Sequence, residues 1–172
     1  FRAQESQLNA LLHPEMPAAA TCEELVAFKR LVVSALAPCA SAVLLDPEFG
    51  APQCIAAADI PGSVGLVIAA EATGYSGDPT ARQSRIQPGW SVHDGKLTGA
   101  SAIKLLFYYP PDAPTAGSTE VLVRRFADEC ALEQLPFFLE ALSYSPDPER
   151  TTLTGDERRR VDAGNRVERV DD

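Results

Sequence analysis

The fold is decided by the stretch SAIKLLFYYP, residues 101–110, in which apolar side chains follow one another around a single charge, Lys104. A strand with one solvated face alternates apolar and polar residues, whereas a strand that is covered on both faces is apolar throughout. The continuous pattern therefore predicts a buried strand over residues 101–109, in a parallel sheet. The charge inside it has to be explained separately.

Three other stretches have the same character, and each is bounded by residues that favour turns. They read SAVLLD at 41–46, VGLVIAAE at 64–71 and PFFLEAL at 136–142. Between the strands we expect a weak helix over 90–99 and a stronger one over 118–133, with a loop rich in Gly, Pro and Ser at 74–89. Strands that alternate with helices indicate an α/β fold, with four parallel strands and helices on the outer face of the sheet.

A further helix precedes the first strand. Thr21 and Glu24 have the spacing of a capping box, in which each side chain accepts a hydrogen bond from the other residue's main chain. Apolar residues then recur at helical spacing until Pro38 ends the helix. They predict the buried stripe Leu25, Phe28, Val32 and Leu36.

Composition excludes several classes of protein. Of the 172 residues 45% are apolar and 23% are charged, the mean hydropathy is −0.07, and 15 basic against 24 acidic residues give a net charge of −9. Nucleic acid is not an expected partner, because phosphate binding needs a basic face. Apolar runs are too short for a membrane span, and no export signal is visible, so we expect a cytoplasmic protein.

Metal and nucleotide motifs are absent from the sequence. The four cysteines are widely spaced, only His13 and His93 accompany them, and no pattern of metal ligands results, so we expect buried free thiols and no metal. Dinucleotide, P-loop, zinc-protease and serine-hydrolase signatures are also missing.

Four ionisable residues lie in, or at the end of, the four apolar strands: Asp46, Glu71, Lys104 and Glu140. A buried charge costs several kcal/mol unless it is paired. In a barrel of βα repeats the strand ends converge on the face that carries the active site, where carboxylates and an amine could perform acid–base and imine chemistry. The alternative is that Lys104 and Glu140 only neutralise each other on neighbouring strands.

Five blocks, in this order and spacing, resemble the class I tagatose-bisphosphate aldolase family, which includes the sulfofructose-phosphate aldolases. They read EELVAFKRLVVSALAP, SAVLLDPEFGAPQCI, GLVIAAEATGY, GASAIKLLFYYPPDAP and PFFLEALSYS, within residues 21–160. The resemblance implies a (β/α)8 TIM barrel and a lyase of carbohydrate metabolism. Such an enzyme cleaves a ketose bisphosphate, such as tagatose 1,6-bisphosphate, through a lysine Schiff base and without a cofactor. The products are dihydroxyacetone phosphate and glyceraldehyde 3-phosphate.

The resemblance also implies roles for the four residues. Glu140 is similar to the family's proton-shuttling glutamate on the fifth strand, and Lys104 to the fourth-strand lysine that binds and polarises the substrate. Asp46 and Glu71, at the ends of the second and third strands, are implied to bind the substrate.

Several strands of the family pattern are not found in these 172 residues. They include the first strand, and the sixth, which in the family carries the Schiff-base lysine. About four of eight βα units are present, so we expect a partial barrel, with an aldolase domain over 1–160 and a divergent polar tail over 161–172. We expect this polypeptide alone to be inactive. An alternative is a fragment that only binds a sugar phosphate or associates with another chain, and a homo-oligomer is one way to cover the open strand edges. A third hypothesis is that Lys104 itself forms the imine.

Overall fold

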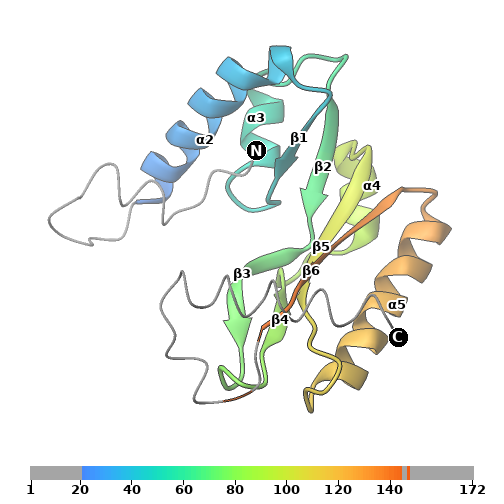
Figure 1. The fold of residues 1–172 in the computed structure, drawn as a ribbon. Coiled ribbons are helices and arrows are strands. Elements are labelled where there is room, and N and C mark those ends of the chain that lie inside the picture. The colour runs from blue at the N-terminus through green and yellow to red at the C-terminus, as the bar shows by residue number, and fades with distance from the viewer. Residues whose placement is uncertain (1–20, 145–146, 148–172) are drawn as a thin grey trace, which may run out of the picture.

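A computed structural model describes residues 21–144 and 147 (Figure 1). Four strands form one parallel sheet in the order β1-β2-β5-β6. This confirms the predicted α/β architecture of a partial barrel, since each strand falls within a predicted range and all neighbours are parallel. The strands are β1 (Ala42–Leu45), β2 (Gly65–Ala69), β5 (Ala102–Tyr108) and β6 (Phe137–Leu142).

Helices separate the strands, as the sequence pattern predicts. In Figure 1, α2 and α3 lie at the β1 end of the sheet, and α5 lies beside β6. The expected weak helix is α4, which ends at Gly99 in a left-handed conformation with φ 90°. The helical segments are α2 (Cys22–Leu36), a 3-10 turn η1 (Ala37–Cys39), α3 (Ala51–Ala56), α4 (Val92–Thr98) and α5 (Ala116–Leu132).

The start of α2 confirms the predicted capping box. Thr21 Oγ1 accepts a hydrogen bond from the Glu24 main-chain N–H at 3.2 Å, and Glu24 Oε2 accepts one from the Thr21 main-chain N–H at 2.8 Å. The predicted buried stripe is only partly right, because the buried residues of the helix are Leu25, Lys29 and Val33. The face that packs on the sheet is therefore rotated by one residue from the expected one.

The two faces of the sheet have different surroundings. Leu45, Ile68, Ile103 and Leu105 belong to the main core, together with Phe126 of α5. Side chains alternate between the faces of a strand, so the neighbours of these residues point to the opposite face, which we call the inner face. Its residues include Val67, Ala69, Ala102, Lys104, Leu106 and Tyr108.

Two elements differ from expectation. The predicted loop at 74–89 contains most of an antiparallel hairpin, β3 (Glu71–Ser76) and β4 (Gln83–Ile86), and the short helix α3 was not predicted. The hairpin is rich in Gly, Ser, Thr and Asp and is largely exposed, so it has no apolar alternation that would predict strands. Gly74 and Gly77 both take φ of 84° in it.

Other expectations have mixed outcomes. The four cysteines are free, but only Cys54 and Cys130 are buried. Burial raises the pKa of the Cys130 thiol to about 11, which makes this thiol unreactive at neutral pH.

The expected domain boundary at residue 160 and the polar tail 161–172 lie outside the described residues. Across the part of the chain that the structure describes, no helix is both long and apolar enough for a bilayer span.

Gly95 in α4 has a packing role that a helix-propensity argument would miss. A Cβ at this position would lie 2.8 Å from Ile103 Cδ1 and 2.9 Å from Trp90 Cζ2. Gly117, near the start of α5, has nothing within 4 Å of its added Cβ. The two glycines therefore form a matched pair, one enclosed and one open.

We predict opposite effects of alanine at these positions on the free energy of unfolding, measured by urea denaturation. Gly95→Ala should lower it by roughly 1–3 kcal/mol, because the extra methyl overpacks the core. Gly117→Ala should raise it by roughly 0.4–1 kcal/mol, because it restricts the unfolded chain. Stabilisation by both substitutions would show that Ile103 and Trp90 do not limit the side chain at position 95.

Candidate active site

A buried ammonium group stands on the inner face of the sheet. Lys104, in the middle of β5, is 6% exposed. Its Nζ lies 2.7 Å from Glu71 Oε1 and 2.5 Å from Glu140 Oε2. The expectation that Lys104 and Glu140 lie within reach of each other is therefore confirmed. Glu71 joins them, so the structure brings three of the four sequence-predicted residues together.

Strand register explains why these side chains meet. Lys104 pairs with Ala69 of β2, and Glu140 of β6 pairs with Leu106, two residues further along β5. Two steps along a strand return to the same face, so all these side chains leave the sheet on its inner side. Ala70 ends the pairing of β2 by donating its N–H to the Lys104 carbonyl at 2.8 Å, and Glu71 follows directly.

The two carboxylates around Lys104 differ in exposure. The Glu71 side chain is 4% exposed and also accepts a hydrogen bond from the Leu106 main-chain N–H at 3.0 Å. The Glu140 side chain is 51% exposed. Glu71 therefore pairs with Lys104 in the protein interior. Glu140 contacts the Lys104 ammonium and is also accessible to solvent. A half-exposed carboxylate beside a fixed ammonium can exchange protons with a bound molecule, as general acid–base catalysis requires.

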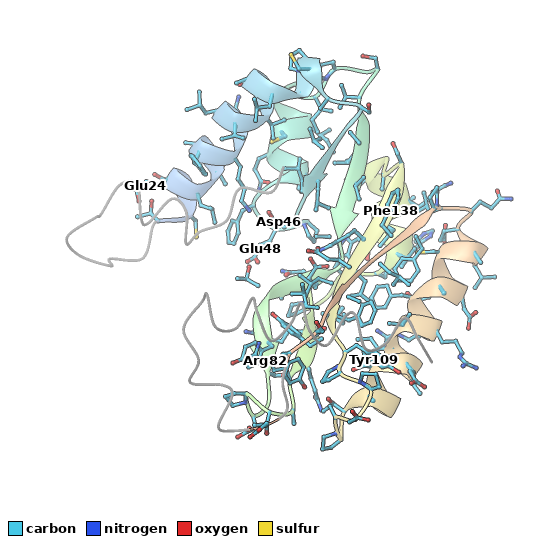
Figure 2. The ribbon with its side chains drawn as sticks, in the orientation of Figure 1. Glu24, Asp46, Glu48, Arg82, Tyr109 and Phe138 are labelled. Carbon is cyan, nitrogen blue, oxygen red and sulfur yellow. The ribbon has the colours of Figure 1, made fainter. Side chains whose placement is uncertain are left out.

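Asp46, the fourth predicted residue, lies in a different ion pair. It follows β1, and Figure 2 shows it next to Glu48. Its carboxylate accepts hydrogen bonds from Lys29 Nζ of α2 and from the main-chain N–H groups of Phe49, at 2.6 Å, and Glu48, at 3.2 Å. The contacts described for Asp46 thus tie it to α2 and to its own loop, and not to Lys104.

These hydrogen bonds determine the charge state of Asp46. Burial acts to raise the pKa of this carboxyl, but the hydrogen bonds from Lys29 and from the Phe49 main chain, with the Lys29 charge, outweigh burial. The net pKa of Asp46 is lowered, so the group is ionised at neutral pH.

Lys29 is a residue that the sequence analysis missed. It is 6% exposed, and its Nζ lies 5.9 Å from the centroid of the Phe49 ring. The signal was present in the sequence, because Lys29 lies four residues after Leu25 and four before Val33. That spacing places all three on one helix face. A lysine centred on an apolar stripe needs a buried anion, and Asp46 provides it.

The described residues offer no metal site, since no three His, Cys, Asp or Glu side chains among them group closely enough to hold an ion.

Comparisons with known proteins agree with one another. Residues 10–163 match the profile of the DeoC/LacD family aldolases. The chain is similar to "Tagatose 1,6-diphosphate aldolase 2" of Enterococcus faecalis, with 42% identity over 126 residues, which are 72% of this chain and 37% of that protein. It is also similar to "Tagatose 1,6-diphosphate aldolase" of Streptococcus agalactiae, with 37% identity over 143 residues, covering 82% of this chain and 43% of that one.

Among solved structures, the chain resembles Cgl0159 of Corynebacterium glutamicum with a TM-score of 0.58. The identity is 21%, and the match covers 83% of this chain and 48% of the other, a likeness of fold. The chain spans about two-fifths of the length of the curated relatives it matches.

We predict that the Lys29–Asp46 pair contributes stability that depends on pH. Lys29→Met should lower the free energy of unfolding at pH 7 by roughly 3–5 kcal/mol, because it leaves a buried carboxylate unpaired. The double variant Lys29→Met/Asp46→Asn should recover part of this loss. Urea denaturation of the unsubstituted chain, the two single variants Lys29→Met and Asp46→Asn, and the double variant measures the effect. Asp112→Asn, at an exposed position, is the control.

The sign of the pH dependence follows from the lowered pKa of Asp46. The stability due to this group is fully present above the ordinary carboxyl pKa of about 4, and it is lost as pH falls through the lower folded value. Asp46→Asn should therefore lower the free energy of unfolding at pH 7, and this loss should become smaller below about pH 4. A loss of unfolding free energy in Asp46→Asn that stays constant from pH 7 down to pH 2 would contradict the lowered pKa of Asp46.

Proposed function

This chain belongs to the DeoC/LacD family of aldolases, and from that premise we propose that it forms part of a Schiff-base aldolase that cleaves ketose bisphosphates. The proposed substrate class includes tagatose 1,6-bisphosphate, with dihydroxyacetone phosphate and glyceraldehyde 3-phosphate as products. The setting we propose is carbohydrate metabolism in the cytoplasm. The names of the relatives support the substrate class, and the cluster around Lys104 supports the chemistry.

The observation that carries the proposal is the contact between Glu140 and Lys104 on the inner face. In a retro-aldol step a base removes the proton of the C4 hydroxyl as the C3–C4 bond breaks, and the electron pair moves into the iminium at C2. An acid then returns a proton to C3. Glu140, half-exposed and beside a cation, is suited to both transfers.

Lys104 is proposed to orient the substrate through hydrogen bonds and positive charge. In the observed arrangement its Nζ donates to Glu71 and lies against Glu140, so both carboxylates hold it in place. A nucleophilic lysine must present a free amine within bonding distance of the carbonyl. The imine is therefore proposed to form on another lysine, which the family resemblance assigns to a sixth strand.

Asp46 and Glu71 are proposed to serve the substrate from the strand ends. Glu71 would act through Lys104, because its carboxylate is buried and already holds that ammonium. Asp46 is held ionised by Lys29 and would present its charge beside β1. Neither carboxylate is as open to solvent as that of Glu140.

A chimera tests the proposed function. In it, this chain replaces the segment that it matches in the Enterococcus faecalis relative, whose remaining residues are proposed to supply the imine lysine. We predict cleavage of tagatose 1,6-bisphosphate, and a decrease in kcat of roughly 10²–10⁴-fold in Glu140→Gln with a small change in KM, because a proton-transfer group has been removed. The measurement is a coupled assay of triose phosphate release.

Two controls define the outcome. Glu129→Gln, at a partly exposed glutamate of α5 that pairs with Arg125, should leave kcat unchanged. A polypeptide of these 172 residues alone should show no turnover and no adduct after borohydride treatment with dihydroxyacetone phosphate. A chimera that folds but does not cleave the sugar bisphosphate would refute the proposed activity. Cleavage by the 172-residue polypeptide that disappears in Lys104→Ala would instead move the imine to Lys104.

A further inference from the structure

An arginine outside the Lys104 cluster lies among three tyrosine rings. Arg82 precedes β4 in the hairpin, and Figure 2 labels it near the ends of the sheet strands. Its guanidinium carbon lies 4.7 Å from the ring centroid of Tyr75, 4.8 Å from that of Tyr144 and 5.8 Å from that of Tyr108. The rings come from the hairpin, from the residues after β6 and from the end of β5.

The group is held firmly in this position. The Arg82 main-chain N–H donates to Tyr144 Oη at 2.8 Å, and the side-chain Nε donates to the Pro79 carbonyl at 3.0 Å. The Tyr108 ring makes edge contacts with Tyr75 and Tyr144, at centroid distances of 5.4 and 6.2 Å. The hairpin is thereby fixed to the carboxyl ends of β5 and β6, with the guanidinium at the centre of the contact.

The charge of Arg82 has no acidic partner within the described part of the chain. The ion pairs there involve Lys29, Arg30, His93, Lys104 and Arg125. Aromatic faces stabilise a guanidinium without neutralising it. The hydrogen bond described for the Arg82 side chain comes from Nε, so its terminal nitrogens are available to a ligand. A planar pair of N–H groups fits the oxygens of a phosphate.

The position of Arg82 relates it to the Lys104 cluster. Tyr108 lies four residues after Lys104 on β5, so both side chains leave the inner face, with Cα atoms roughly 13 Å apart along the strand. Burial raises the pKa of the Tyr108 hydroxyl; the charge of Arg82 acts to lower it, and the charges of Glu71 and Glu140 act to raise it.

We propose that Arg82, caged by Tyr75, Tyr108 and Tyr144, binds one phosphate group of the substrate. This inference rests on the proposed function for its choice of a sugar phosphate. It adds a phosphate site formed by the β3–β4 hairpin, on the same face as Lys104. The tyrosines orient the guanidinium, and the ligand supplies the missing anion.

Phosphate titration of the 172-residue chain, followed by the NMR signal of Arg82 Nε–H, tests this site directly. Inorganic phosphate and tagatose 1,6-bisphosphate should each produce a saturable shift, and sodium chloride at the same ionic strength should not. Arg82→Gln should weaken the affinity for tagatose 1,6-bisphosphate by roughly 10- to 100-fold, as expected for loss of hydrogen bonds to a charged group. Arg85→Gln, an exposed arginine of the same hairpin, is the matched control and should change it less than twofold.

The outcomes separate this inference from the proposed function. No saturable shift at Arg82, or equal losses in Arg82→Gln and Arg85→Gln, would overturn the phosphate site even if the chimera cleaves substrate. Phosphate binding that depends on Arg82 would support the site even if the chimera is inactive. Arg82→Lys addresses misfolding of the Gln variant, because it keeps the charge and should retain more affinity than Gln if the site binds an anion.

Discussion

The structure depends on how one ammonium group is accommodated on a covered parallel sheet. Lys104 sits in a strand whose other face is packed in the core, and an unpaired charge there would cost several kcal/mol. Glu71 meets this requirement from β3, and its second oxygen binds the Leu106 main chain. The break between β2 and β3 at Ala70 and the path into the hairpin place Glu71 where Lys104 needs it. The same path carries Arg82 to the ends of β5 and β6.

Because Glu71 and Glu140 differ in exposure, they are suited to different roles around Lys104. A buried carboxylate with two hydrogen bonds keeps the ammonium in place, and a half-exposed carboxylate contacts both the ammonium and solvent. Because the family is an aldolase family, a proton-transfer role for Glu140 and an orienting role for Lys104 form one consistent proposal. Arg82 extends it along the inner face, from the reacting carbons to a terminal phosphate.

The sequence predicts the strands well because each is a continuous apolar run, and the four ionisable residues stand out against those runs. It also predicts that Lys104 and Glu140 meet. Lys29 was missed because the stripe of α2 was assigned one residue away, at Leu25, Phe28, Val32 and Leu36, which left the lysine outside it. The hairpin was missed because its strands are exposed and polar, and its stabilising contacts come from distant residues such as Tyr144. Long-range pairing of this kind leaves no local pattern.

The most direct measurement is a pair of double-mutant cycles on the free energy of unfolding, one combining Lys104→Met with Glu71→Gln and the other combining it with Glu140→Gln. The account predicts a coupling of roughly 2–3 kcal/mol between Lys104 and Glu71, at the upper end of the range for residues in contact. It predicts less than about 1 kcal/mol between Lys104 and Glu140, because solvent screens the half-exposed carboxylate. Equal couplings, or a larger one for Glu140, would contradict the assignment of Glu71 as the anchor and Glu140 as the group free to transfer protons.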